Sequence, residues 1–258
     1  MRTVGTLLPD VDRSQIPDGG ASGFESAHLS LIRRRPTVAE SIAEVLTDAI
    51  VYGDVEPGAP ITQLELARRF DVSRIAVRDA LHLLRRRGLI VDSPSHRTFV
   101  QTVSIETARE VADYRVLLEA EAARIACQRR TPGDLEELDQ HIARQKELAR
   151  RDDFGGFRRA DVAFHSRIAD LCDNTLLAEQ LEYVAYRSQQ IVSYATRVTP
   201  DGKDYDKTRG MRATVRRHGQ MVRALRSRDA EHAEQVFRAC IAESHARLLD
   251  RLRASEHV

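Results

Sequence analysis

Two side chains that commonly bind metal ions stand four residues apart in the second half of the sequence, Asp161 and His165. The apolar residues around them recur with helical period, so both side chains project from one helix face, one turn apart. A carboxylate and an imidazole in this arrangement can share a divalent metal ion. A structural hydrogen bond between them fits the same spacing, and the pair alone leaves both interpretations open.

A second candidate pair, His218 and Cys240, flanks a short turn at Ser227 and Arg228. His218 lies on the inward stripe of its predicted helix. At about 1.5 Å per residue, His218 lies roughly 13–14 Å before the turn and Cys240 roughly 16–17 Å after it, so they are level across the helix pair. His245 would lie roughly 7–8 Å too far along to replace Cys240. A thiolate is a good zinc ligand, but a buried cysteine also serves as a small apolar filler.

Arg115 lies on the inner stripe of the first helix of this half, in phase with Val111, Ala112 and Ala122. A buried unpaired charge is costly, so Arg115 needs an anionic partner. A salt bridge to Glu119, four residues later, would supply one.

The elements that position these residues are all helical in period after Ser104. We predict helices over about 105–129, 134–151, 156–172, 175–196, 211–226 and 229–252, with one long polar loop from Thr199 to Tyr205. Residues 105–252 therefore predict an all-α helical bundle.

Residues 34–103 have a different pattern, typical of a winged helix-turn-helix. Three helices are predicted, the third running from its N-cap Ser73 to Arg87, and two β-prone pieces after it indicate a hairpin. Residues 1–33 contain Pro, Gly, Ser and Asp without periodicity, which predicts a flexible tail. The expected fold class is mainly α, an N-terminal winged helix-turn-helix followed by a C-terminal helical bundle.

Eight arginines and three acidic residues lie between Arg68 and Arg97, in a chain whose net charge is only +1. A local basic patch of this kind suggests a polyanion partner, although charge alone fits a solvated arginine-rich helix equally well. Together with the winged helix-turn-helix pattern it favours double-stranded DNA as partner. Arg74 and Arg78 share the outer face at the start of the third helix, and arginine can bind guanine O6 and N7 together, so we expect both to read bases. Arg68 and the run 85–87 lie farther away and are expected at phosphates.

The stretch PGAPITQLELARRFDVSRIAVRDALHLLRRRGLIV resembles the DNA-binding motif of GntR-family bacterial regulators, whose pattern runs PG, L-A, V-S-R-x-x-V-R-[ED]-A-L and G-L-I. The resemblance covers roughly residues 38–103. It implies that Arg74 and Arg78 contact bases and that Ser73 belongs to the same DNA-binding motif. Arg97 stands where many members have a wing glycine, so we expect the wing to contact DNA through this side chain.

The helical half resembles the FCD effector domain of the FadR subfamily. The matching motifs are Y-R-x-x-L-E at 114–119, D-x-x-F-H at 161–165 and N-x-L-L at 174–177. The resemblance implies one pocket that holds a divalent metal, with zinc the expected ion, and a small carboxylate effector. The implied metal ligands are Asp161, His165 and His218, with Cys240 where the family has another histidine. The implied effector-binding residues are Arg115 and Asn174.

Composition agrees with a protein of two domains in the cytoplasm. The 258 residues are 42% hydrophobic and 31% charged, and the three cysteines lie far apart, as is usual in a reducing compartment. No apolar run reaches the length of a membrane span, and the N-terminus lacks a secretory signal pattern.

We therefore expect a ligand-responsive transcriptional regulator, a homodimeric repressor released from its operator by a small organic acid. One alternative is an architectural DNA-binding dimer without effector. Another is a metal-dependent hydrolase built on Asp161, His165 and His218. A hydrolase would need a general base and an oriented nucleophile, and because no motif supplies them, we expect no enzymatic activity.

Overall fold

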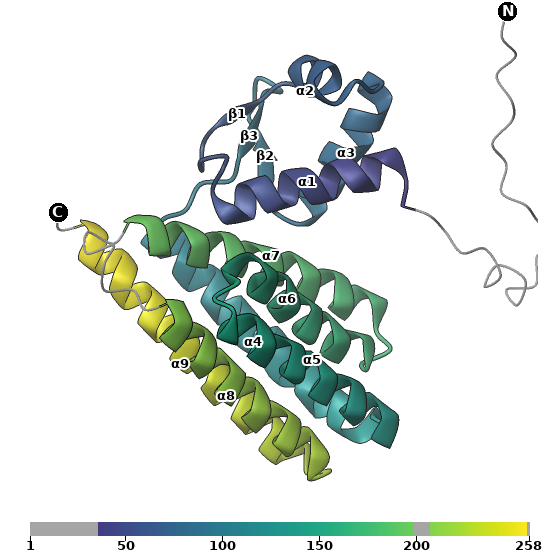
Figure 1. Cartoon of the computed structure of the whole chain (residues 1–258), viewed down its shortest axis with the longest axis vertical. Helices are drawn as coiled ribbons and strands as arrows, with labels where there is room; N and C mark the ends of the chain where they lie inside the picture. The colour runs from purple at the N-terminus through teal and green to yellow at the C-terminus, as the bar shows by residue number, and fades with distance from the viewer. Residues whose placement is uncertain (1–35, 199–206, 257–258) are drawn as a thin grey trace, which may run out of the picture. The chain divides into compact units, whose positions relative to one another are not determined.

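The computed structural model describes residues 36–198 and 207–256. The predicted tail over 1–33 and the predicted loop from Thr199 to Tyr205 lie outside these residues. The first elements are those of a winged helix-turn-helix, drawn in purple and blue in Figure 1. They are α1 (Val38–Tyr52), β1 (Pro60–Ile61), α2 (Gln63–Phe70), α3 (Arg74–Arg86), β2 (Ile90–Asp92) and β3 (Thr98–Val100).

Local residue chemistry explains where α3 begins and ends. Ser73 is its N-cap, and its Oγ accepts a hydrogen bond of 3.2 Å from the backbone N–H of Ala76. Gly88 follows the helix with φ of +65°, a left-handed conformation that glycine adopts without steric cost. Val77, Ala80, Leu81 and Leu84 bury the inner face of the helix.

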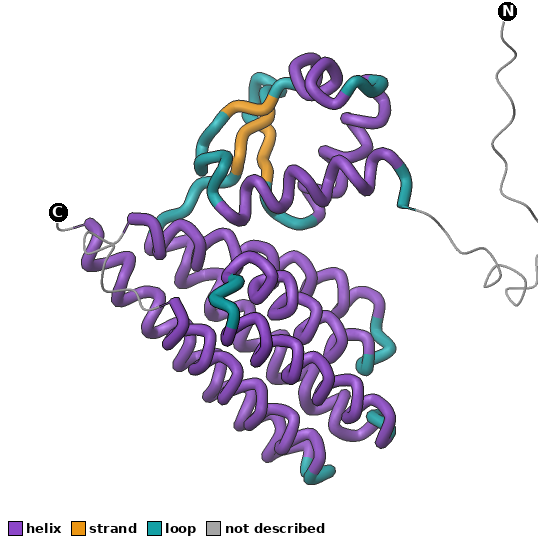
Figure 2. Tube along the Cα trace, in the orientation of Figure 1, coloured by secondary structure: helices purple, strands orange, loops and turns teal. Residues whose placement is uncertain are grey.

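The sheet of the wing has three antiparallel strands in the order β1-β3-β2, shown in orange in Figure 2. Ile90 pairs with Val100 in the predicted hairpin, and Pro60 pairs with Phe99 on the other side of β3. The sequence did not predict β1, because a strand of two residues is too short to show an alternating pattern.

Among the described residues of the C-terminal half, six helices form a bundle, as the sequence predicted (Figure 1). They are α4 (Ile105–Arg129), α5 (Pro132–Arg150), α6 (Phe154–Asp170), α7 (Thr175–Val198), α8 (Lys207–Arg226) and α9 (Ala230–Glu256). Helix α4 packs against α7 and α9, while α5 packs against α6 and α8. This arrangement brings α4, α6 and α8, which carry Arg115, Asp161, His165 and His218, into mutual contact.

Buried apolar side chains form two clusters, one drawn from residues 42–100 and one from residues 108–252. All three cysteines are buried free thiols. Among the described residues, no helix combines the length and the apolar composition that a bilayer crossing requires.

Candidate metal and effector-binding site

Three predicted ligands meet inside the bundle. Asp161 and His165 come from α6 and His218 from α8, and one ligand atom of each lies within 4.8 Å of those of the others. Two imidazoles and a carboxylate are a donor set suited to zinc and similar divalent ions. The donor chemistry and the spacing therefore fit a metal ion.

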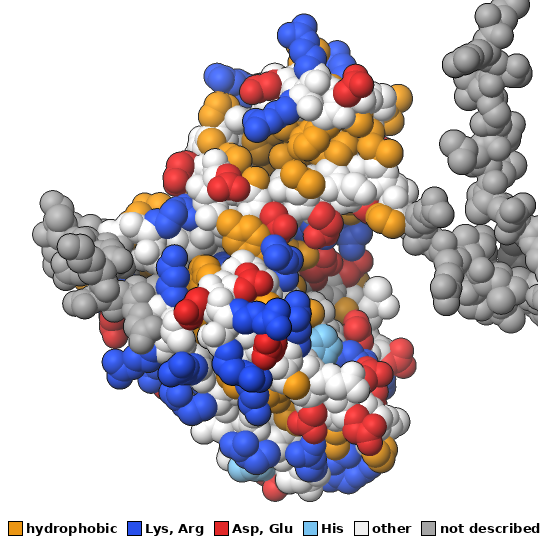
Figure 3. Space-filling model, viewed as in Figure 1, with side chains coloured by type: hydrophobic (Ala, Val, Ile, Leu, Met, Phe, Trp, Pro, Cys, Tyr) orange, Lys and Arg blue, Asp and Glu red, His pale blue; other side chains and the backbone are white. Residues whose placement is uncertain are grey.

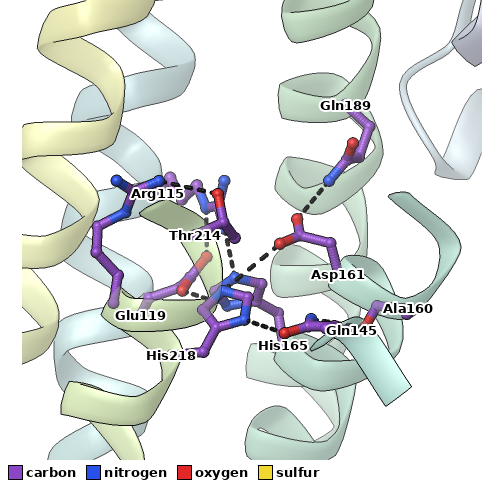
Figure 4. Close-up of polar contacts among 10 residues, drawn as sticks. Arg115, Glu119, Gln145, Ala160, Asp161, His165, Gln189, Thr214 and His218 are labelled. Carbon is purple, nitrogen blue, oxygen red and sulfur yellow. Dashed lines mark hydrogen bonds and ion pairs between the residues drawn. The ribbon is translucent and has the colours of Figure 1, made fainter. Parts of the chain in front are cut away.

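His218 is held in a position suited to a metal ligand by Gln145 of α5 (Figure 4). Its Nδ1 lies 2.8 Å from Gln145 Oε1, while Gln145 Nε2 donates to the carbonyl of Ala160 at 3.1 Å. Because the amide nitrogen is used at Ala160, the amide oxygen faces His218 and accepts its Nδ1–H, which leaves Nε2 unprotonated. Burial lowers the pKa of His218 to about 3, so the ring is neutral near pH 7.

His165 is oriented by Glu119 of α4. Its Nδ1 lies 2.7 Å from Glu119 Oε2, and Glu119 also pairs with Arg115, as one alternative for that arginine predicted. Burial by itself would raise the pKa of Glu119, but the charge of Arg115 and the contact with the His165 ring outweigh burial and hold the pKa below its usual range. Arg115 Nη2 lies 2.9 Å from His165 Nε2, the atom that a metal ion would use.

Asp161 of α6 directs its carboxylate toward the ligand nitrogens of His165 and His218. Its Oδ1 lies 3.5 Å from His218 Nε2, and its Oδ2 accepts a hydrogen bond of 2.5 Å from Gln189 Nε2 of α7. Burial would raise the pKa of Asp161, but nearby His165, His218 and Arg115 lower it. The carboxylate is therefore ionised and available as a ligand.

A cavity of about 170 Å³ opens beside this group. Arg115, Asp161, His165 and His218 line it, together with Cys240. Cys240 does not belong to the three-residue group; its Sγ lies 3.5 Å from Gln220 Oε1, and burial raises the pKa of its thiol. Asp161, His165 and His218 thus form one group of three ligands, and Cys240 lies on the wall of the adjoining cavity.

Asn174 lies elsewhere. Its Oδ1 accepts a hydrogen bond of 3.1 Å from the backbone N–H of Leu177 at the start of α7, and the residue is exposed and is not among those that line the cavity. The structure supports a capping role for Asn174, and its assignment to the effector site stays a prediction from resemblance.

Comparison with known proteins identifies the two halves. The FCD domain family matches residues 110–255, and the family described as bacterial regulatory proteins, gntR family, matches residues 38–100. The chain belongs to the GntR family, with a C-terminal FCD domain. This family consists of transcriptional regulators and not of enzymes, which confirms the expectation of no enzymatic activity.

Individual relatives agree with this assignment. The HTH-type transcriptional repressor RspR of Escherichia coli (strain K12) is 26% identical over 200 residues, covering 78% of this chain and 84% of that protein. The galactonate operon transcriptional repressor of the same strain is 26% identical over 229 residues, covering 81% and 96%. The solved structure of E. coli McbR/YncC has the same fold, with a TM-score of 0.70 at 20% identity, covering 84% of this chain and 99% of that one.

The predicted DNA-contacting residues of this GntR-family chain are exposed. They are Arg68 on α2, Ser73, Arg74 and Arg78 at the start of α3, and Arg97 in the wing. Arg97 stacks over Phe99, with 5.5 Å from its guanidinium carbon to the ring centroid. All three arginines of the run 85–87 are paired within the chain, Arg85 with Asp92 at 2.8 Å, Arg86 with Glu179 at 3.1 Å and Arg87 with Glu44. Their contact with phosphates stays a prediction.

Sequence reasoning missed several functional candidates. Ile75 is 63% exposed between Arg74 and Arg78, where an apolar side chain can contact a thymine methyl group. Because Ile75 lies outside the apolar core stripe of α3, the sequence could have indicated that this side chain is exposed. Gln145 and Gln189 look like ordinary surface residues of a helix, and only their burial in the bundle shows that they orient the ligands.

Proposed function

We propose that this chain is a repressor that binds its operator as a homodimer and leaves it when a small carboxylate binds in the bundle. In this proposal residues 34–103 bind DNA, and residues 105–252 bind the effector and dimerise, in the cytoplasm. The observation that supports it most directly is the buried group of Asp161, His165 and His218 on the wall of a cavity, beside Arg115.

On the DNA side, α3 is the recognition helix. Arg74 and Arg78 lie one turn apart near its N-terminus, are exposed, and would reach base edges in the major groove. The Ser73 cap keeps the first turn of the helix intact. Arg68 and Arg97 flank this tip from α2 and the wing and would contact the DNA beside it.

On the effector side, Asp161, His165 and His218 would hold a divalent metal, with zinc the expected ion. When bound, it would supply a positive centre with an open position for an effector carboxylate. Gln145 accepts a hydrogen bond from His218 Nδ1, and Glu119 Oε2 lies 2.7 Å from His165 Nδ1, so that a polar side chain stands behind each ring. Cys240 is the candidate for a further ligand, since it lines the same cavity.

Arg115 would take part in effector binding. Its Nη2 now lies against His165 Nε2, and one lone pair cannot serve both a guanidinium and a metal ion. Metal loading would therefore free one edge of Arg115, while Glu119 keeps its hold on Nε. That edge lines the cavity, where it can bind a carboxylate.

An exposed apolar face supports the homodimer. Leu117 on α4 is 59% exposed and Leu176 on α7 is 75% exposed. A hydrogen bond of 3.0 Å between Tyr114 and Gln180 joins these two helices beside them. Large exposed apolar side chains on neighbouring helices are typical of a protein interface, and a second copy of the chain would bury these two leucines.

Metal analysis and operator footprinting of the full chain, purified without chelators or a metal-affinity tag, test the proposal. We expect bound zinc in the wild type and a loss of zinc in His218→Ala. His232→Ala removes an exposed histidine of α9 and is the matched control. We further expect some small organic acids to release the operator. A footprint that no acid changes would contradict the effector role and favour an architectural DNA-binding dimer. Zinc content that is near zero in the wild type, or unchanged in His218→Ala, would contradict the metal site.

A further inference from the structure

The walls of the effector cavity have a large excess of positive charge. Five arginines line the cavity, and Asp161 is the one acidic residue among the lining side chains of the described chain. The five are Arg115, Arg158, Arg217, Arg247 and Arg251. Glu119 pairs with Arg115 and Glu243 pairs with Arg247, and both acids lie outside the lining. A cavity wall of this composition favours a negatively charged ligand.

Helix α8 extends this charge to the surface. It contains one lysine and six arginines and no acidic residue. Figure 3 shows Lys and Arg side chains gathered over the part of the bundle where α8 lies, and Arg212 and Arg216 are exposed on this helix. A surface of one sign beside a cavity raises the local concentration of ligands of the opposite sign.

Arg217 is the lining arginine whose surroundings point most clearly to a ligand. It is half-buried, and its Nη2 donates to a neutral acceptor, Thr214 Oγ1, at 2.9 Å. No ion pair joins Arg217 to a carboxylate of the described residues. Glu243 and Asp161 attract its charge only from beyond ion-pairing distance, and Glu243 pairs with Arg247 at 2.5 Å. A partly buried guanidinium without an ion-pair partner is stabilised when an anion binds beside it.

Ser188 supplies a second, independent sign of a ligand. It is 2% exposed, lines the cavity from α7, and its Oγ has no hydrogen-bond partner among the described residues. A buried hydroxyl without a partner costs free energy that a ligand oxygen would recover. The cavity thus offers a hydroxyl donor in addition to its cations.

We infer that the effector is a small dianion, with one anionic group at the metal and Arg115 and a second at Arg217, and with Ser188 bonded to one of its oxygens. This inference rests on the proposed function and restricts the effector to ligands with two anionic groups. A cavity of about 170 Å³ is close to the roughly 150 Å³ that holds benzene, so a ligand of about six to nine non-hydrogen atoms fits. Short dicarboxylates meet these limits. Phosphate esters of small acids meet the size limit and also have two anionic groups, but their phosphate adds about one further charge near neutral pH.

The test compares acids that differ in charge but little in size. Zinc-loaded full chain is titrated calorimetrically with succinate, malate and phosphoglycolate, and with the monoanions butyrate and 2-hydroxybutyrate. Arg217→Gln removes the charge and keeps most of the length of the side chain. Arg216→Gln, at the neighbouring exposed position outside the cavity, is the matched control. Ser188→Ala tests the hydroxyl separately.

We expect the best dianion to bind at least about tenfold more tightly than its monoanion analogue, the lower end for a charge-assisted hydrogen bond. Arg217→Gln should abolish that preference and leave monoanion binding unchanged, whereas Arg216→Gln should retain it. Ser188→Ala should weaken dianion binding and should not lower the melting temperature of the ligand-free protein, because it removes a buried hydroxyl that has no partner among the described residues. Whether succinate or phosphoglycolate binds better identifies the chemical source of the second charge.

Two results would overturn the inference in different ways. If monoanions release the operator and dianions bind no better, the charge class is wrong and the proposed function stands. If no acid of either series binds to a chain that still binds DNA, the proposed effector function fails together with this inference. Melting curves and operator binding of each variant without ligand separate either result from misfolding.

Discussion

Replacing Gln145 with leucine removes the residue that determines which nitrogen of His218 carries the proton. Gln145 is fully buried, accepts from His218 Nδ1 at 2.8 Å and donates to the Ala160 carbonyl at 3.1 Å. Leucine has a similar volume and cannot accept the proton. The proton is then expected to move to Nε2, which lies 3.5 Å from the ionised Asp161. A histidine protonated at Nε2 cannot bind a metal through that atom.

The expected magnitude differs between the metal-free and the zinc-loaded protein. Without metal, the proton on His218 Nε2 finds a new acceptor in Asp161. We therefore expect the free energy of unfolding to fall by about 1–2 kcal/mol, toward the low end of the cost of a buried group without a hydrogen-bond partner. Loss of an outer partner of a ligating histidine typically weakens metal binding by about 10- to 100-fold. With zinc in excess, the mutant therefore loses roughly a further 1.4–2.7 kcal/mol, because binding to the folded state adds to stability.

The assay is urea unfolding with EDTA and with excess zinc, combined with zinc competition against a chromophoric chelator. Gln140→Leu, an exposed position on the same helix, is the control and should behave like the wild type in both. A folded Gln145→Leu protein with unchanged zinc affinity would refute the reasoning, because His218 would then coordinate without this acceptor. Equal losses of stability with and without zinc would refute it as well.

Three further predictions concern DNA, symmetry and the cavity wall. Arg74→Ala or Arg78→Ala should cost about 1–3 kcal/mol in specific operator binding and alter the footprint, and footprints like the wild type would exclude base readout by these residues. Leu117→Asp combined with Leu176→Asp should shift the protein from dimer to monomer in sedimentation at micromolar concentration; a wild type that sediments as a monomer would rule out the dimer. Cys240→Ala should reduce zinc affinity if the thiolate is a ligand, and unchanged affinity in the chelator competition would leave a three-ligand site with Cys240 as packing.

Features that depend on residues close together in the sequence, such as helices and their caps, were predictable. The six helices of the bundle follow from apolar residues at helical spacing, and the start of α3 follows from a serine that can cap it. Asp161 and His165 share a face because any two residues four apart on a helix do so. These features depend on neighbours within one or two turns, and the sequence contains all of that information.

Contacts between helices were decided by the tertiary structure. Gln145, Gln189 and Ser188 are polar residues in amphipathic helices, and nothing in their own segments shows that the bundle buries them against the site. Arg115 could be given a partner in the sequence, yet its second contact with His165 required α4 and α6 to lie side by side.

Cys240 shows most clearly what could not be predicted from the sequence. Counting residues from the turn placed it level with His218, and it does line the same cavity, but its Sγ points to Gln220 and not into the group of three ligands. The rise per residue determines how far along a helix a side chain lies. The direction in which it points around the axis depends on how the paired helices are rotated against each other, and that rotation is determined by packing across the whole bundle.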